Sequence, residues 1–157
     1  MPQTQTLYHI VIATLNLEPC LVGANRLQMY NAISHDLDEK QCRLYRINAG
    51  NEHIHILCSL HPSISLDDLV SSIKKSSTMI IQTEKLFPDF TGWREDYGAF
   101  TGSYKDKVAM SKYVEQQHEF HREVSFKDEF AAMLKTSGIQ ACHRVVTPFR
   151  QPVVKSE

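Results

Sequence analysis

His53 and His55 stand one residue apart in the apolar segment EHIHILC, and this spacing constrains both the fold and the chemistry of the chain. In an extended strand, residues i and i+2 share a face, so the two imidazoles project side by side while Ile54 and Ile56 project to the opposite side. Two imidazoles on one face can bind one metal ion, or each can half-bury against its neighbours. The spacing alone leaves both interpretations open.

The composition limits the class of protein. The chain has 157 residues, of which 42% are hydrophobic and 22% charged, as expected for one globular domain. No apolar run reaches the ~20 residues of a membrane span and no signal-peptide pattern opens the chain, so we expect a cytoplasmic protein with no membrane partner. The formal net charge of -1 means that any nucleic-acid partner requires a local basic patch.

Hydrophobic periodicity and turn signals predict a regular succession of elements, in which Ser65 and Ser125 have the spacing of helix caps, Gly138 is a helix stop and the glycine-rich run at residues 89–98 is a loop. In order, the elements are a strand, a helix, two strands joined by a short turn, a helix, a short strand and two further helices, at residues 7–15, 24–39, 40–47, 52–61, 65–87, 99–104, 106–124 and 125–138. This order predicts an α+β fold, a ferredoxin-like split βαβ sandwich with a central antiparallel sheet and extra C-terminal helices. We expect the first strand and the histidine strand in the middle of the sheet.

The helix predicted at residues 106–124 offers further groups for a metal-dependent reaction. Tyr113 and Gln117 are four residues apart, so a phenol and an amide oxygen lie on one helical face. If this helix covers the histidine face, Gln117 can complete a metal shell and Tyr113 can act as a nucleophile on a phosphate. Taken singly, Tyr113 is more typical of an amphipathic residue at a helix boundary, and Gln117 is more typical of an exposed helix position. His118 and His121 also lie in reach, but histidines at a helix end more often interact with the helix dipole.

Several motifs occur together in a fixed order. They are YHIVIAT in the first strand, EHIHIL, SLDDLVSSIKKSS, WREDYGAF, YVEQQ around Tyr113, and SFKDEF with LKTSGI, which together span roughly residues 7–139. In this set the chain resembles the single-tyrosine HUH transposases of bacterial insertion sequences, including the REP-associated tyrosine transposases. In the HUH motif of this sequence, Ile54 is the hydrophobic centre between the two histidines.

The resemblance implies a function and a set of roles. It implies a homodimer that cleaves and rejoins single-stranded DNA at hairpin-bearing element ends, with Mg²⁺ or Mn²⁺ as cofactor. His53, His55 and Gln117 would be the metal ligands, with Gln116 as an alternative to Gln117. Tyr113 would be the nucleophile that forms a 5′-phosphotyrosine and leaves a free 3′ hydroxyl. In several members the tyrosine helix serves the histidine pair of the other subunit, so the active site is either composite or contained in one chain.

The resemblance also divides the chain and leaves alternatives. It assigns residues 1–140 to the transposase catalytic domain, and residues 141–157, with their two prolines, to a flexible or partner-docked tail. Lys74, Lys75 and Arg94 are the candidate DNA contacts, which would place the protein on the nucleoid when DNA is bound. The alternatives are a non-catalytic nucleic-acid-binding module of the same architecture and a metal-dependent phosphohydrolase that uses water in place of Tyr113.

Overall fold

A computed structural model describes residues 3–139 of the chain, so the predicted tail at residues 141–157 lies outside the described residues. Its centre is a four-stranded sheet in the order β2-β3-β1-β4, in which every neighbouring pair is antiparallel. The strands are β1 (Tyr8–Thr14), β2 (Leu44–Ala49), β3 (His53–Cys58) and β4 (Trp93–Thr101). The predicted α+β ferredoxin-like arrangement, with the first strand and the histidine strand in the middle, is confirmed.

β4 differs most from its prediction, and β2 begins four residues later than predicted, at Leu44. β4 begins at Trp93, not near residue 99, and ends at Thr101. It pairs with β1 from Tyr8 opposite Thr101 to Ile12 opposite Tyr97 and, after a register shift, again where Thr14 lies opposite Trp93. The glycine at position 98 indicated a loop from sequence, but the structure uses it for packing, because a Cβ there would lie 2.5 Å from the ring of Phe130.

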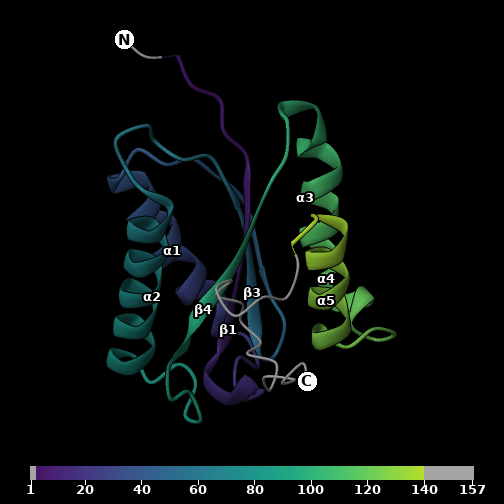
Figure 1. Ribbon diagram of the computed structural model, residues 1–157. Helices are drawn as coiled ribbons and strands as arrows, with labels where there is room; N and C mark the ends of the chain where they lie inside the picture. The colour runs from purple at the N-terminus through teal and green to yellow at the C-terminus, as the bar shows by residue number, and fades with distance from the viewer. Residues whose placement is uncertain (1–2, 140–157) are drawn as a thin grey trace, which may run out of the picture.

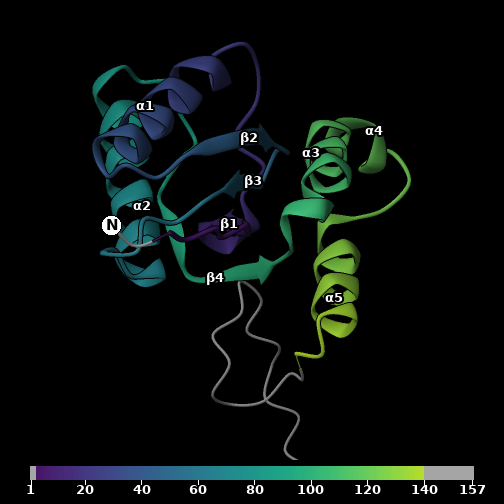
Figure 2. The ribbon, with the colours of Figure 1, turned by 90° about the horizontal axis from the view of Figure 1, so that it is seen from above.

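Two helices, α1 (Arg26–Glu39) and α2 (Leu66–Thr83), cover one face of the sheet (Figures 1 and 2). α2 begins where Ser65 Oγ accepts a hydrogen bond from the Asp68 backbone N–H at 3.0 Å, as the capping pattern predicts. The main apolar core lies between these helices and the sheet. It includes the following fully buried side chains: Ile10, Ile12, Met29, Ile33, Leu37, Ile54, Ile56, Leu69 and Ile73.

The opposite face is covered by α3 (Lys107–Glu115), α4 (Gln117–Phe120) and α5 (Phe126–Thr136), which lie on the other side of the sheet in both views (Figures 1 and 2). Two short 3₁₀ turns follow strands of the sheet: η1 (Leu15–Leu17) follows β1, and η2 (Tyr104–Asp106) connects β4 to α3. Among the described residues, no helix is both long and apolar enough to span a lipid bilayer.

The helix predicted at residues 106–124 is broken at Gln116, and the break has a visible cause. The side-chain amide of Asn48 on β2 donates to the carbonyl of Val114 at 2.9 Å and to that of Glu115 at 3.1 Å. These carbonyls would otherwise accept the next hydrogen bonds of a continuous helix, so a side chain inserted at this point ends α3. α4 then begins at Gln117.

A smaller apolar cluster fixes α5 to this second face. Val11 and Ala13 of β1, Phe100 of β4, and Phe126 and Phe130 of α5 make up this cluster, and all five are buried. α5 is capped by Ser125, whose Oγ accepts from the Asp128 N–H at 3.2 Å. The helix ends before Gly138, which has φ 73°, as the sequence predicts. The side chains of α5 are therefore held at defined positions over the sheet.

Candidate metal and tyrosine site

β3 presents different chemistry to the two faces of the sheet. Ile54 and Ile56 join the core under α1 and α2, whereas His53 and His55 point to the layer of α3, α4 and α5. Both imidazoles have 0% exposed surface. The alternation expected from the sequence is thus present, and both histidines are fully buried beneath the second helical layer.

Two residues from the second layer meet this pair. His121, which follows α4, and Glu129 of α5 each place a potential ligand atom so that, with His53 and His55, all four atoms lie within 4.8 Å of one another. His121 Nε2 lies 3.1 Å from His53 Nε2 and 2.9 Å from Gln117 Oε1. Three segments distant in the sequence therefore converge on one buried point.

Glu129 occupies an unusual environment for a carboxylate. Its Oε1 lies 2.9 Å from His55 Nε2 and its Oε2 lies 2.9 Å from His121 Nε2, yet its side chain is only 1% exposed. Neither oxygen, and not His55 Nε2 either, makes a hydrogen bond of acceptable geometry with any described residue. These side chains approach one another closely, but their donor and acceptor atoms are not aligned for hydrogen bonds. This is the arrangement expected of ligands that all point toward one metal ion. Imidazole, carboxylate and amide oxygen are ligands that divalent metals use in proteins, so the residues present fit such an ion.

The protonation states of three of these groups, His53, His55 and Glu129, also suit metal binding. Burial lowers the pKa of His53 to about 4 and lowers the pKa of His55. Burial alone would raise the pKa of Glu129, but His121 and His55 outweigh it and hold that pKa at about 2. Burial opposes charge on His121, but contact with Glu129 outweighs it and raises the His121 pKa. His53 and His55 are therefore neutral and Glu129 is ionised at neutral pH, which are the states in which they donate electron pairs.

Outer groups orient the two strand histidines. Glu52 Oε1 lies 2.9 Å from His53 Nδ1 and accepts a hydrogen bond from it, which leaves His53 Nε2 as the atom that faces the cluster. His9 Nε2 of β1 lies 2.7 Å from His55 Nδ1, and burial lowers the His9 pKa to about 3. A hydrogen bond from His55 Nδ1–H to His9 leaves His55 Nε2 free in the same way. Carboxylate and imidazole partners of this kind commonly fix the tautomer of metal-binding histidines.

Tyr113 lies next to the histidine pair of its own chain. Its ring centroid is 6.0 Å from that of His55 and 5.8 Å from that of His9. Its hydroxyl lies 3.9 Å from the sulfur of Met133 on α5. Burial, with the negative charge of Glu129 acting in the same direction, raises the Tyr113 pKa well above its usual value. The phenol is therefore protonated in the metal-free protein.

Gln117 is turned so that its oxygen faces the cluster. Its Nε2 donates to the Tyr113 carbonyl at 3.2 Å, and its Oε1 points at His121. The side chain has 0% exposed surface, whereas Gln116, the alternative ligand, is exposed. The structure thus brings four sequence-predicted residues together in one chain, namely His53, His55, Tyr113 and Gln117.

The sequence did not single out three residues at this site, namely His121 and Glu129 of the cluster and His9 beside it. His121 was assigned to a helix dipole, although its position four residues after Gln117 was a usable signal for a shared face. The structure places it in the cluster instead. His9 lies in a strand of nearly continuous apolar character, and the pairing of this strand with β3 brings His9 beside His55. Glu129 gave no sequence signal, because its burial depends on how α5 packs.

A cavity of about 480 Å³ opens beside the cluster. Gln117, His121 and Glu52 form part of its wall, and Arg26, Arg122 and Lys127 supply positive charge around them. This is the route by which an anionic chain could reach the buried ligands.

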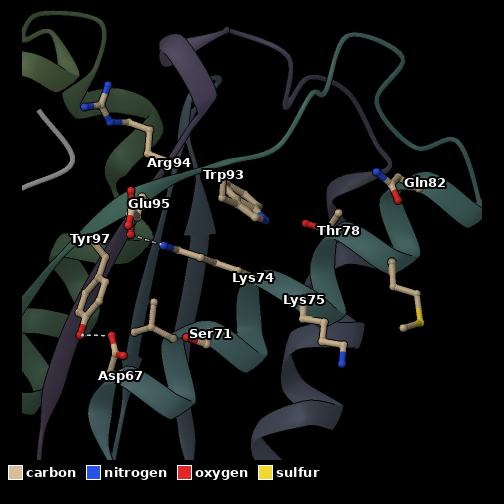
Figure 3. A pocket seen from close by; sticks show the side chains of 12 residues that line it. Asp67, Ser71, Lys74, Lys75, Thr78, Gln82, Trp93, Arg94, Glu95 and Tyr97 are labelled. Carbon is tan, nitrogen blue, oxygen red and sulfur yellow. Dashed lines mark hydrogen bonds between the residues drawn. The ribbon is translucent and has the colours of Figure 1, made fainter.

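The predicted DNA contacts lie elsewhere. Lys74, Lys75 and Arg94 line a second groove, of about 830 Å³, between α2 and β4 (Figure 3). Lys74 donates to the Glu95 carbonyl at 2.7 Å, and its ammonium lies 5.6 Å from the centroid of the Tyr97 ring. In Figure 3 the Arg94 guanidinium points away from both lysines. The groove is on the α2 side of the sheet, so the lysines and the metal ligands face different sides of the molecule.

Comparison with known proteins gives one family and two similar solved structures. The family model described as "Transposase IS200 like" matches residues 2–117. A protein from Deinococcus radiodurans R1, described as a candidate transposase, has 19% identity and a TM-score of 0.57, and the match covers 74% of this chain and 95% of that one. A REP-associated tyrosine transposase bound to a REP hairpin has 15% identity and a TM-score of 0.58, over 79% of this chain and 76% of that one. No curated protein matches the chain. At these identities the two structures show a shared fold.

Proposed function

The chain belongs to the family of IS200-like transposases, and on that premise we propose that it cleaves and rejoins single-stranded DNA at hairpin-bearing ends through a tyrosine nucleophile and a divalent metal. One observation carries the proposal. Within a single chain, Tyr113 lies beside His55 in a buried cluster whose donor atoms fit a metal ion. A nucleophile next to a cation site is what phosphoryl transfer through tyrosine requires.

Each residue has a part in the proposed reaction. His53, His55 and Gln117 hold Mg²⁺ or Mn²⁺, which when bound favours the phenolate and neutralises charge that develops on the phosphate. The Tyr113 oxygen, after loss of its proton, attacks the scissile phosphorus. The bond from phosphorus to the 3′ oxygen breaks, so the 5′ phosphate stays on the tyrosine and a 3′ hydroxyl departs. Rejoining is the reverse attack by another 3′ hydroxyl, and no external energy source is needed because the phosphodiester bond energy is conserved.

The geometry favours a site that is complete within one chain. Tyr113 and Gln117 already lie against His53, His55 and His121 of the same molecule. The homodimer implied by the resemblance would then carry two complete sites, and subunits would not need to exchange tyrosine helices.

Two surfaces are proposed to hold DNA. The cavity with Arg26, Arg122 and Lys127 opens beside Gln117 and His121, so it would hold the single strand around the scissile phosphate. The groove with Lys74 and Lys75 would contact backbone phosphates of the hairpin stem, as basic side chains do without reading sequence. Arg94 is a weaker candidate for a phosphate contact in this groove, because its guanidinium lies 3.8 Å from the Asp96 carboxylate.

The test uses a denaturing gel with 3′-labelled single-stranded oligonucleotides, each with a hairpin from the DNA that flanks the gene, in Mg²⁺ or Mn²⁺. The wild-type protein should give a labelled band at the mass of protein plus DNA. This band should disappear in Tyr113→Phe and His53→Ala and remain in Tyr104→Phe, a control whose side chain is largely exposed. Hydrolysis that survives Tyr113→Phe would indicate a phosphohydrolase, and binding without cleavage would indicate a non-catalytic module.

Mixing tests the location of the site. If one chain holds the complete site, equal amounts of Tyr113→Phe and His53→Ala protein, allowed to exchange subunits, should remain inactive together. Restored adduct formation in the mixture would show that the tyrosine serves the partner's histidines.

A further inference from the structure

We propose that His121 and Glu129 are metal ligands, and that the resulting set of three imidazoles and one carboxylate selects a first-row transition ion such as Mn²⁺ or Zn²⁺ over Mg²⁺. The proposal rests on the proposed function for the reaction that the ion serves. Metal binding itself is independent of DNA. Both residues lie beyond residues 2–117, the part of the chain that the transposase family model matches.

The spacing of the four groups is that of ligand atoms. Protein ligands lie about 2.1 Å from ions of this class, so two of them are about 3 Å apart at adjacent positions and about 4 Å apart at opposite ones. The separations between His121 Nε2 and His53 Nε2, between His121 Nε2 and Glu129 Oε2, and between His55 Nε2 and Glu129 Oε1 are 3.1, 2.9 and 2.9 Å. Small shifts would bring all four atoms around one ion.

The two carboxylate oxygens are the second line of evidence. Both are buried and lack hydrogen bonds of acceptable geometry within the described residues, as does His55 Nε2. An ionised carboxylate without aligned partners is costly to bury, and a bound cation offsets that cost. A simple ion pair between Glu129 and His121 would satisfy one oxygen but would leave the other, together with His55 Nε2, without an aligned donor.

The local structure prepares His121 as a ligand. Its Nδ1 lies 2.9 Å from the Val124 carbonyl and donates to it, so Nε2, which faces the cluster, is the atom that would bind an ion after losing its own proton. Glu129 is placed by the packing of Phe126 and Phe130 on either side of it in α5. His53 stacks on Phe126 with ring centroids 3.7 Å apart, which ties the strand ligand to the same helix.

The chemistry of the set decides which ions it prefers. Mg²⁺ is bound through oxygen and keeps several waters, whereas imidazole favours transition ions, with affinity that rises from Mn²⁺ toward Zn²⁺. The ligands identified from sequence, two histidines and one amide, leave room for waters on a hard ion. The addition of His121 and Glu129 makes a largely closed site in which nitrogen predominates.

The test is isothermal titration of metal-stripped full-length protein with Mn²⁺, Zn²⁺ and Mg²⁺, without DNA. Wild-type protein should bind Mn²⁺ at least 100-fold more tightly than Mg²⁺. His121→Asn and Glu129→Gln should each weaken Mn²⁺ binding at least tenfold. Two exposed neighbours supply matched controls, His118→Asn and Glu119→Gln, and these should leave the affinity unchanged. Equal Mn²⁺ affinity in all five proteins, or equal binding of Mn²⁺ and Mg²⁺ by the wild type, would overturn the proposal.

A second measurement does not depend on the variants folding. Pulsed electron paramagnetic resonance of Mn²⁺ bound to the wild-type protein counts coordinated imidazole nitrogens. Three coordinated imidazole nitrogens would support the proposal, and two would overturn it. The outcome also separates this inference from the proposed function. A site with three imidazole nitrogens in a protein that forms no DNA adduct would contradict the proposed DNA chemistry alone. DNA adducts formed by a protein whose ion has two imidazole nitrogens would contradict this inference alone.

Discussion

The two faces of the sheet have opposite chemistry although they are built from the same strands. On the α1 and α2 face, Ile54 and Ile56 pack into a continuous apolar core. On the other face, His53 and His55 meet a buried polar cluster that is flanked by the five-residue apolar cluster under α5. Burial of apolar surface stabilises a fold, whereas burial of polar groups opposes folding unless they are paired or bind a ligand. The first face therefore supplies stability, and the second uses part of that stability to hold polar groups in buried positions.

The largest expected effect is on stability, and it distinguishes Ile54 from its neighbour His53 in β3. Ile54→Ala should lower the free energy of unfolding of the metal-free protein by about 2–5 kcal/mol, because it leaves a cavity in the main core. His53→Leu should change it by less than about 1.5 kcal/mol and still abolish Mn²⁺ binding, because an apolar side chain of similar volume replaces a desolvated imidazole. Urea unfolding followed by circular dichroism measures both. A greater loss in His53→Leu than in Ile54→Ala would break the comparison.

Acid should lower the stability of the metal-free protein mainly through the buried histidines on the face of the sheet that α3, α4 and α5 cover. Burial lowers the pKa of His9 to about 3 and that of His53 to about 4, so between these values and about 6.5 the unfolded chain binds protons that the folded chain excludes. Stability of the metal-free protein should therefore fall as pH drops through this window. His121, whose pKa is raised, acts in the opposite sense, because its contribution is full below pH 6.5 and is lost as pH rises.

Urea midpoints measured from pH 7 to pH 4 test this dependence. His9→Leu removes one of the excluded imidazoles and should make the slope shallower. An unchanged slope in His9→Leu would show that His9 is not among the groups responsible.

An intermediate effect is expected at the contact between β4 and α5. A Cβ at position 98 would lie 2.5 Å from the buried Phe130 ring, so Gly98→Ala should cost about 1–3 kcal/mol and displace Glu129 with the helix. Mn²⁺ affinity should fall with it. Gly102→Ala is the matched control, because its nearest atom is the sulfur of Met110, the end of a flexible side chain, at 2.7 Å. Similar Mn²⁺ affinities in the two variants would argue that α5 does not position a ligand.

The smallest effect compares the helix caps of the two faces. Ser65 and Ser125 accept the same hydrogen bond at the starts of α2 and α5, at 3.0 and 3.2 Å. Replacement of either by alanine should cost about 1 kcal/mol of stability. Only Ser125→Ala should also weaken Mn²⁺ binding, because only α5 carries Glu129. Thermal unfolding with and without Mn²⁺ distinguishes the two, and an equal metal-dependent stabilisation in both would contradict the assignment of Glu129.

Local patterns predicted much of this molecule. The order of elements, the central positions of β1 and β3, and the caps at Ser65 and Ser125 were all readable, because they depend on periodicity and on contacts within a few residues. The start of β4 and the break at Gln116 were not. Each depends on a partner far along the chain, β1 in one case and the amide of Asn48 in the other.

The sequence by itself determined that His53 and His55 share a face opposite Ile54 and Ile56, since alternation along a strand follows from backbone geometry alone. Only the tertiary structure decided what meets that face. Glu129 reaches it because Phe126 and Phe130 dock α5 on the sheet, and nothing in the sequence distinguishes this residue from an ordinary surface glutamate. Docking of this kind is the sum of many apolar contacts between distant segments, so no short stretch of sequence encodes it.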